Sequence, residues 1–340
     1  MKTYTPPSSQ PALEIKPDLQ KLYDNIREDL DKVENQLQSI AQSPNKLISE
    51  VGRYLFQKKG KRIRPALLVL CSKLFNYQGE EHILLSAVIE IIHTASLIHD
   101  DIVDKSTMRR GRESVHAKWG PNITVLLGDY LYIKSIGLTL KSTDNQVVRL
   151  LADRSARMIE GEIIEYYMSG NLEMSEQDYF DIINKKTASL FSASCQIGGI
   201  LGNASQKEEQ SLADYGINLG MSFQIVDDLL DYSGDEKVMG KPILSDLKEG
   251  RITLPLIYTL NKDGRAHRDR LKQILNKRSL EGDSQEEILN ILRSNGSLDY
   301  THKKAKEFSD ESKKIISQLP ESAHRDALYL FSDFILTRRK

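Results

Sequence analysis

The stretch HTASLIHDDIVD, residues 93–104, joins a helical apolar pattern to a row of acids. Apolar residues recur at steps of three or four before and along it, at Leu84, Val88, Ile91, Ala95, Ile98 and Ile102. This spacing predicts an amphipathic helix with one face against a core. Because Asp100 and Asp104 are four positions apart, both carboxylates should project from one side of that helix.

Helical spacing continues on either side of this stretch, and the alternation typical of strands is hard to find. The helical segments are separated at Gly60, Asn76 to Gly79, Gly111, Gly120-Pro121, Gly170-Asn171 and Gly234 to Gly250. Since no Gly/Ser-rich linker divides the chain, we predict an all-α protein with a single large domain over residues 18–340. Residues 1–17 are predicted to be a flexible N-terminal arm, and the lysine-rich segment from residue 261 a packing layer.

Composition narrows the class of protein. The 340 residues carry a formal net charge of −1, which argues against a nucleic-acid binder that works through a positive field. No apolar run is expected to approach the ~20 residues that cross a bilayer, and the N-terminus lacks the apolar stretch of a secretory signal. The 2 cysteines, Cys71 and Cys195, cannot build a disulfide framework, so a cytoplasmic location is favoured.

Three aspartates in five positions, Asp100, Asp101 and Asp104, are also a chemical signal. Two charges about 6 Å apart repel by roughly 3 kcal/mol at an effective dielectric of about 20, unless solvent or a cation relieves them. A solvated acidic surface is the ordinary explanation. The alternative is Mg²⁺, which takes one or two carboxylates together with substrate phosphate oxygens.

A second acidic row favours the metal. In QIVDDLLD, residues 224–231, Asp227, Asp228 and Asp231 repeat the DDxxD spacing of the first row. Gln224 falls on the same helical side, and the apolar residues of the segment form the other side. Two copies of this arrangement on two helices with apolar faces are hard to explain as surface charge, so we predict that both rows bind Mg²⁺.

Basic residues accompany these rows along the sequence. They are Lys61 and Arg64 in KKGKRIRP, Arg109 and Arg110 after the first row, Lys186 beside Thr187, and Lys241 in GKP. Arginine forks bind phosphate oxygens bidentately and lysine acts as a point charge, so these residues suggest two anionic sites. Taken alone, residues 58–64 could equally be a solvated basic patch or a nucleic-acid contact. His93 lies on the helical side of Asp100 and could be a ligand-binding or a buried structural histidine.

A di-iron four-helix bundle is an interpretation of a different class. Its signature is a Glu-x-x-His string on each of two helices plus a glutamate from each of two others. The strings from Glu90 to His93 and from Glu113 to His116 match it in part. That interpretation leaves the aspartates and the basic residues unexplained, and we do not favour it.

The chain resembles the trans-isoprenyl diphosphate synthases, or polyprenyl synthetases, in motifs that follow the family's order over roughly residues 55–260. The motifs are GKRIRP, HTASLIHDDIVD, MRRG, GDYL, KT, FQIVDDLLD, GKP and DLKEGRITLP. The resemblance implies an all-α fold of about a dozen helices around a deep central cavity, usually as a homodimer. It also implies the reaction, in which isopentenyl diphosphate is joined to an allylic diphosphate such as farnesyl diphosphate, with release of diphosphate.

The resemblance further implies a role for each matching residue. Two or three Mg²⁺ ions would be held by Asp100, Asp101, Asp104, Asp227, Asp228 and Asp231. The allylic diphosphate would be bound by Arg109, Lys186, Thr187, Gln224 and Lys241, and isopentenyl diphosphate by Lys61, Arg64, His93 and Arg110. Catalysis would be carried by Asp100, Asp104, Lys186 and Asp227. The chain departs from the family's pattern at Arg251, where lysine is more common, and the charge is kept.

Product length is predicted from Ala95 and Ser96, which precede Asp100 by five and four positions and so by about 6–8 Å along the helix. The growing chain should pass this level, where short-chain members of the family carry bulky aromatics. The small side chains here predict a long-chain all-trans product beyond twenty carbons, which Ala95→Phe should shorten. A geranylgeranyl diphosphate synthase, with a deeper residue as the floor of the passage, is the alternative.

Two further classes of protein share part of this pattern of acids. A class I terpene cyclase has one DDxxD and a different second metal motif, and the second DDxxD of this chain speaks against it. A non-catalytic subunit of a heteromeric synthase usually lacks some of the aspartates or the paired arginines, and this chain has all of them.

Overall fold

The structure is a computed structural model that describes residues 19–109, 111–141, 144–233, 243–262, 265–275 and 283–338. Its first half contains α1 (Leu19–Tyr23), η1 (Asp24–Ile26), α2 (Arg27–Ala41), α3 (Lys46–Gln57), α4 (Ile63–Leu74), α5 (Glu81–Val103), α6 (Val115–Trp119) and α7 (Pro121–Thr139). Between α5 and α6, the short strands β1 (Met108–Arg109) and β2 (Arg112–Glu113) pair antiparallel. The predicted arm, residues 1–17, lies outside the described residues.

The second half is helical throughout its described part. It contains α8 (Asn145–Tyr167), α9 (Glu176–Ile183), the π-helical turn η2 (Asn184–Ala188), α10 (Ser189–Leu201), α11 (Gln206–Ser233), α13 (Ser245–Lys248), α14 (Leu254–Lys262), α15 (Arg265–Leu275), α16 (Asp283–Ser294), α17 (Ser297–Ile316) and α18 (Ala323–Thr337). Apart from the β1–β2 hairpin, the described residues form no sheet. The prediction of an all-α protein is confirmed.

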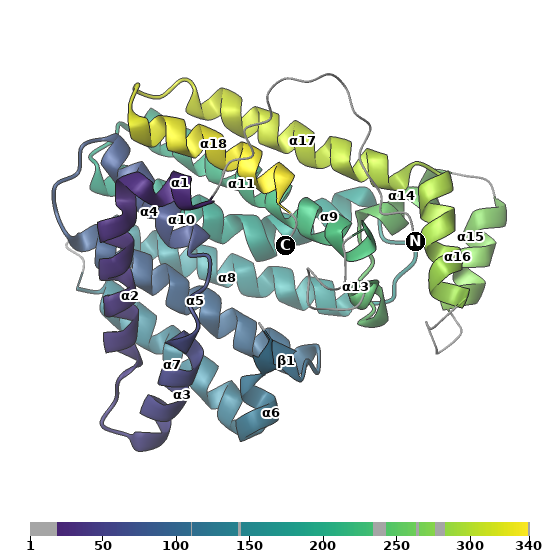
Figure 1. Cartoon of the computed structure of the whole chain (residues 1–340), viewed down its shortest axis with the longest axis horizontal. Coiled ribbons are helices and arrows are strands. Elements are labelled where there is room, and N and C mark those ends of the chain that lie inside the picture. The colour runs from purple at the N-terminus through teal and green to yellow at the C-terminus, as the bar shows by residue number, and fades with distance from the viewer. Residues whose placement is uncertain are drawn as a thin grey trace.

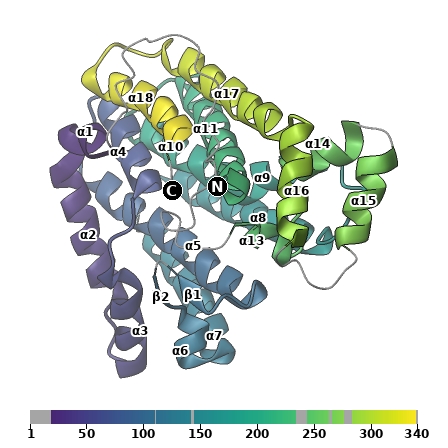
Figure 2. The same ribbon diagram turned by 45° about the vertical axis from the view of Figure 1, so that its right-hand side comes forward.

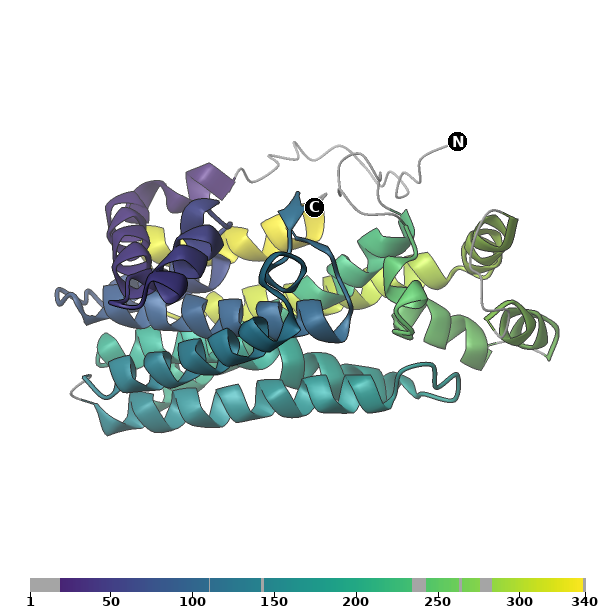
Figure 3. The same ribbon diagram turned by 90° about the horizontal axis from the view of Figure 1, so that it is seen from below.

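Long helices from distant parts of the chain pack side by side (Figure 1). α10 packs on both α11 and α4, α5 packs on α7, and α17 and α18 cover α11. Figure 2 shows α2 and α3 at one end of the molecule and α15 and α16 at the other. Seen from below in Figure 3, the long helices follow one common direction. The ends of α5 and α11, where the acidic rows lie, are therefore held by helices on several sides.

α5 is the helix that the opening stretch predicts. Its apolar stripe is buried as expected, with Val88, Ile91 and Ala95 at 0% exposure. By length and by a mean hydropathy of 1.5, the helix would also suffice to cross a membrane, which corrects the expectation that no run comes close. However, 67% of that apolar window is buried inside the molecule, because α2, α4 and α7 pack around it. This burial is typical of the core helix of a globular protein.

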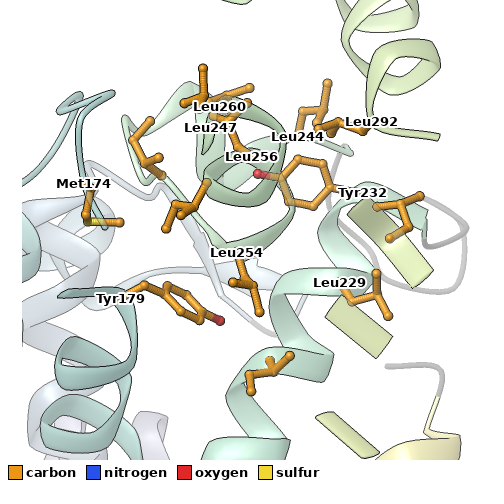
Figure 4. Close-up of a cluster of buried hydrophobic side chains, with 14 of the residues drawn as sticks. Met174, Tyr179, Leu229, Tyr232, Leu244, Leu247, Leu254, Leu256, Leu260 and Leu292 are labelled. Atoms are coloured by element: carbon orange, nitrogen blue, oxygen red, sulfur yellow. The ribbon is translucent and has the colours of Figure 1, made fainter. Parts of the chain in front are cut away.

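The C-terminal end of α11 enters a cluster of buried side chains (Figure 4). Leu229 and Tyr232 of α11 pack there with Leu254 and Leu256 of α14, and Tyr179 joins them from α9. Tyr232 and Tyr179 keep their hydroxyls hydrogen-bonded, the first with Thr253 at 2.7 Å. The cluster thus fixes the last turns of α11, which carry the second acidic row.

Gly216 permits the close crossing of α10 and α11, and its replacement should be costly. A Cβ at this position would lie 2.7 Å from the carbonyl oxygen of Phe191, a backbone atom that cannot turn aside. We expect Gly216→Ala to lower the free energy of unfolding by about 1–3 kcal/mol, measured by urea denaturation. Lys207, which is exposed on the first turn of α11, is the control position. Lys207→Ala should change the free energy of unfolding by less than about 0.5 kcal/mol, and an equally small effect of Gly216→Ala would contradict the tight crossing.

Candidate active site

The first acidic row lies at the C-terminal end of α5, on a helix as predicted. Asp104 caps the helix with helical backbone angles, and its carboxylate accepts a hydrogen bond from Arg251 Nη1 at 3.0 Å. Burial raises the pKa of Asp100 to about 7. Asp101, one position on, is buried on a different side of the helix, where it accepts a hydrogen bond from Arg109 Nε of the hairpin. The row is therefore divided between two sides of α5.

The second acidic row lies on α11 and is more deeply buried than its pattern suggested. Asp228 accepts hydrogen bonds from the Tyr179 hydroxyl at 2.6 Å and from Gln224 Nε2 at 2.8 Å. Burial, together with the charge of Asp246, raises the pKa of Asp228 to about 8. Asp231 is 0% exposed and accepts the backbone N–H of Asp246 at 3.1 Å. Two of the three acids in this row are thus packed inside the molecule.

Arg251 connects the two rows. Its Nη1 donates to Asp104 at 3.0 Å, and its Nη2 donates to Asp246 at 2.9 Å. Because the backbone N–H of Asp246 donates to Asp231, the guanidinium links the last acid of the first row to α13 and, through it, to the last acid of the second row. A lysine, which is a point charge, could not hold both carboxylates in this forked geometry. The departure from the family's usual lysine therefore has a structural consequence.

Lys186 and Thr187 stand between the rows on the π-helical turn η2. Lys186 Nζ lies 2.7 Å from Glu162 and also bonds Glu165, both on α8. Burial lowers the pKa of Lys186, but the two glutamates outweigh it, so the pKa is raised overall. The Thr187 hydroxyl donates to Gln224 Oε1 at 2.8 Å. This turn therefore joins α8 to α11 and places an ammonium group close enough to Asp100 to favour its ionised form.

Asp227 is paired with a residue that the sequence pattern did not reveal. Arg338, which follows α18, is 8% exposed and places Nη2 2.7 Å from Asp227. The same nitrogen donates to the backbone oxygen of Phe223 at 2.6 Å, and the guanidinium carbon lies 3.8 Å from the centre of that ring. The prediction that the C-terminal segment is only a packing layer is wrong at this residue.

The predicted isopentenyl diphosphate residues lie around the start of α4 and the middle of α5. The Arg64 guanidinium lies 4.6 Å from the Phe191 ring centre, and burial lowers its pKa to about 10. Its Nε has no hydrogen-bond partner among the described residues. Lys61 is exposed in the loop before α4, and His93 is half-buried on the side of α5 that carries the first row. Two predicted residues lie outside the described part of the chain: Arg110 and Lys241.

Ala95 and Ser96 lie on different sides of α5. Because successive helical residues are about 100° apart, Ser96 is about 40° from Asp100 around the helix and Ala95 about 140°. Ala95 is 0% exposed and packs in a cluster with Leu127 of α7. Ser96 is half-buried, and its hydroxyl donates to the backbone oxygen of His93 at 2.8 Å. Of the two residues, Ser96 is the one on the side of the acids.

In each Glu-x-x-His motif of the di-iron interpretation, one residue, Glu90 or His116, makes a different contact. The Glu90 carboxylate accepts a hydrogen bond from Arg62 Nη1 at 2.5 Å. His116 Nε2 lies 2.8 Å from the backbone oxygen of Ser106. Since no three His, Cys, Asp or Glu side chains gather as an ion site among the residues that the structure describes, the di-iron interpretation is not supported.

The aspartates of the two rows have the chemistry of Mg²⁺ ligands, although three of them form ion pairs with arginines in this structure. In the described parts of the chain, no three His, Cys, Asp or Glu side chains lie together as an ion site. Instead Arg109, Arg251 and Arg338 each contact one of the aspartates. Carboxylate oxygens on two helices are the ligands that this hard cation prefers. Asp100 and Asp228, whose pKa is raised by burial, are carboxylates that a cation would stabilise in the charged form.

Comparison with known proteins gives a consistent result. The family model described as Polyprenyl synthetase matches residues 45–292. The octaprenyl diphosphate synthase of Haemophilus influenzae is 36% identical over 311 residues, 92% of this chain and 93% of that protein. The geranylgeranyl diphosphate synthase of Saccharolobus solfataricus is 35% identical over 324 residues, 93% of this chain and 97% of that protein.

A solved structure agrees over almost the whole length. It is a polyprenyl synthase from Caulobacter crescentus, complexed with calcium and isoprenyl diphosphate. It matches with a TM-score of 0.90 at 31% identity, covering 96% of this chain and 99% of that one. The chain belongs to the polyprenyl synthetase family.

Proposed function

We propose that the protein is a polyprenyl diphosphate synthase, which adds isopentenyl diphosphate units to an allylic diphosphate such as farnesyl diphosphate and makes a long-chain all-trans product. The observation that carries the proposal is the pair of acidic rows at the ends of α5 and α11. Arg251 connects the rows through Asp246, and Lys186 lies close enough to Asp100 to favour its ionised form. Family membership and the likeness to an octaprenyl diphosphate synthase support the activity and the long product.

The first step breaks the carbon–oxygen bond of the allylic diphosphate, and the electron pair leaves with the diphosphate. Lys186, Thr187 and Arg109 would bind its phosphate oxygens, and fixed cations of this kind stabilise charge that develops in a transition state. Mg²⁺, held by Asp100, Asp104 and Asp227 with help from their neighbours, would supply further neutralisation of the leaving group. Lys186 would exchange Glu162 and Glu165 for phosphate in this step.

The second step forms a bond between the allylic carbon and the double bond of isopentenyl diphosphate. Lys61, Arg64, His93 and Arg110 would hold the diphosphate of this second substrate so that its double bond lies close to the cation. Loss of a proton then restores a double bond, and the released diphosphate would accept that proton. Two or three Mg²⁺ ions per site and a cytoplasmic location belong to the same proposal, the latter supported by two buried, unbridged cysteines.

The activity is tested by incubating purified protein with farnesyl diphosphate, isopentenyl diphosphate and Mg²⁺, and then sizing the products. We expect prenyl diphosphates longer than twenty carbons, and none after EDTA. Asp100→Asn should lower kcat by at least about 100-fold, because it removes a metal ligand. Asp310→Asn on the surface of α17 is the control and should leave kcat unchanged.

Each departure from these results has a distinct meaning. Accumulation of a twenty-carbon product alone would assign the chain as a geranylgeranyl diphosphate synthase. Absence of any product from the wild-type protein would favour a non-catalytic subunit of a heteromeric synthase.

Ser96→Phe is predicted to shorten the product, because the aromatic ring would enter the space beside the acids where the chain must pass. Ala95→Phe is the matched comparison: its ring would enter the packed cluster around Leu127 and should mainly lower stability, by about 1–3 kcal/mol. The measurements are product size and thermal unfolding of both variants. If Ala95→Phe shortened the product and Ser96→Phe did not, the passage would lie on the other side of α5.

We also propose that a second copy of the chain covers α7 and α8, giving a homodimer. Leu126, Ile133 and Leu140 follow one another at seven-residue steps along α7 and are 65%, 74% and 66% exposed. Ile163 and Tyr167 of α8, at 62% and 85% exposure, extend the apolar surface. Monomers seldom expose so continuous an apolar surface, and a helix face with this repeat can pack against its own symmetry copy.

Ile133→Asp is expected to convert the dimer to a monomer, because it would bury a charge at the centre of this surface. The measurement is molar mass by light scattering during size-exclusion chromatography. Leu330→Asp, on α18 and 43% exposed, is the control and should leave the mass of a dimer. A wild-type protein that elutes as a monomer would refute the homodimer.

A further inference from the structure

Arg62 stands out among the basic residues before α4, because its backbone lies in the left-handed region. Its φ of 53° and ψ of 36° are unusual for a residue other than glycine. The residue is also 7% exposed, although arginine is seldom buried without partners. A strained backbone under a buried charge persists only where surrounding contacts fix it.

Two glutamates provide those contacts. Glu34 of α2 accepts hydrogen bonds from Arg62 Nε at 2.5 Å and from Nη2 at 3.2 Å. Glu90 of α5 accepts a hydrogen bond from Arg62 Nη1 at 2.5 Å. Both carboxylates are buried, at 6% and 3% exposure. The fork of the guanidinium therefore fixes the orientation of the loop against two helices at once, as only a planar, forked donor can.

The same cluster adjoins three residues of the proposed isopentenyl diphosphate site. Lys61 precedes Arg62 directly and Arg64 follows it by two positions, so the direction of both side chains depends on the backbone at Arg62. Glu90 lies three positions before His93, close to one turn of α5, so the clamp also fixes the distance from the loop to that histidine. Tyr23 adds a hydrogen bond from its hydroxyl to the backbone oxygen of Lys61 at 2.6 Å.

We propose that Arg62, clamped by Glu34 and Glu90, is a positioning residue that aims Lys61 and Arg64 at the diphosphate of isopentenyl diphosphate. This inference rests on the proposed function. It assigns no contact with substrate to Arg62, whose donors are directed to the two glutamates. Its consequence is selective: loosening the clamp weakens the binding of isopentenyl diphosphate and leaves the allylic site as it is.

A second bond between the same two helices distinguishes positioning from simple support. Asp29 of α2 lies 2.8 Å from His82 Nε2 of α5 and 3.6 Å from Lys73 of α4. This contact ties α2 to the same neighbours but touches no residue of the loop before α4. If Arg62 only held the helices together, loss of either bond would have similar effects on both substrates.

The experiment compares Arg62→Lys with Asp29→Asn. Lysine keeps the charge but loses the fork, so we expect the KM for isopentenyl diphosphate to rise about tenfold and the KM for farnesyl diphosphate to stay within about twofold. Asp29→Asn should lower the melting temperature about as much as Arg62→Lys does, but leave both KM values within about twofold of the wild-type values. A triple variant, Arg62→Met with Glu34→Gln and Glu90→Gln, removes the buried charges together so that the protein can fold. It should show the same selective rise in KM.

Four other results would overturn the inference. If the wild-type protein is active and Arg62→Lys has the same KM for isopentenyl diphosphate, Arg62 is not a positioning residue, while the proposed function stands. An equal rise of both KM values, or the same rise in Asp29→Asn, would make Arg62 a structural support only. A wild-type protein without turnover would refute the proposed function and this inference with it.

Discussion

The burial of aspartates at the ends of two helices is the constraint on which the rest of the structure depends. Carboxylates about 6 Å apart repel by roughly 3 kcal/mol at an effective dielectric of about 20, and burial adds to this cost. Arg251 offsets it by bonding Asp104 at 3.0 Å and Asp246 at 2.9 Å. Because Asp246 of α13 in turn donates its backbone N–H to Asp231 of α11, the contact that stabilises the charges also connects the ends of α5 and α11.

The site balances its charges by internal pairs, and each pair contains a group that the proposed reaction needs. Asp101 is held by Arg109, Asp227 by Arg338, and Lys186 by glutamates of α8. A diphosphate that arrives with cations brings both signs of charge, so acids and bases can exchange partners without leaving a buried charge unpaired. In the proposed reaction, either component alone would leave some of these groups without a partner, at a cost that is largest for the buried Asp101. The pairs therefore fit a ligand that brings both signs of charge.

Local sequence patterns were enough to predict the helices and the placement of the acidic rows on them. They could not predict contacts between residues that are far apart in the sequence. The four-residue spacing of Asp100 and Asp104 was sufficient to place both on one side of a helix, because that geometry depends on neighbours in sequence. Arg338 was missed, since its partner Phe223 is 115 positions away and no local period links them. Arg62 was overlooked between two basic residues because burial and a left-handed backbone leave no mark on composition. The product-length prediction from Ala95 and Ser96 used the distance along α5 and stays a prediction. The angle around the helix separates the two residues.

That angle explains how a single helix can serve several tasks. With about 100° between successive residues, Ser96 and Asp100 share one side of α5, while Ala95 faces the packed cluster with α7. Asp101 lies on a further side, together with Thr94, beside the small cavity that Arg62 and Arg109 line. α2, α4 and α7 pack on different sides of the helix. Because each side presents its own residues, a substitution on one side can act on one proposed role, whether metal binding, substrate binding or product length, and leave the other two unchanged.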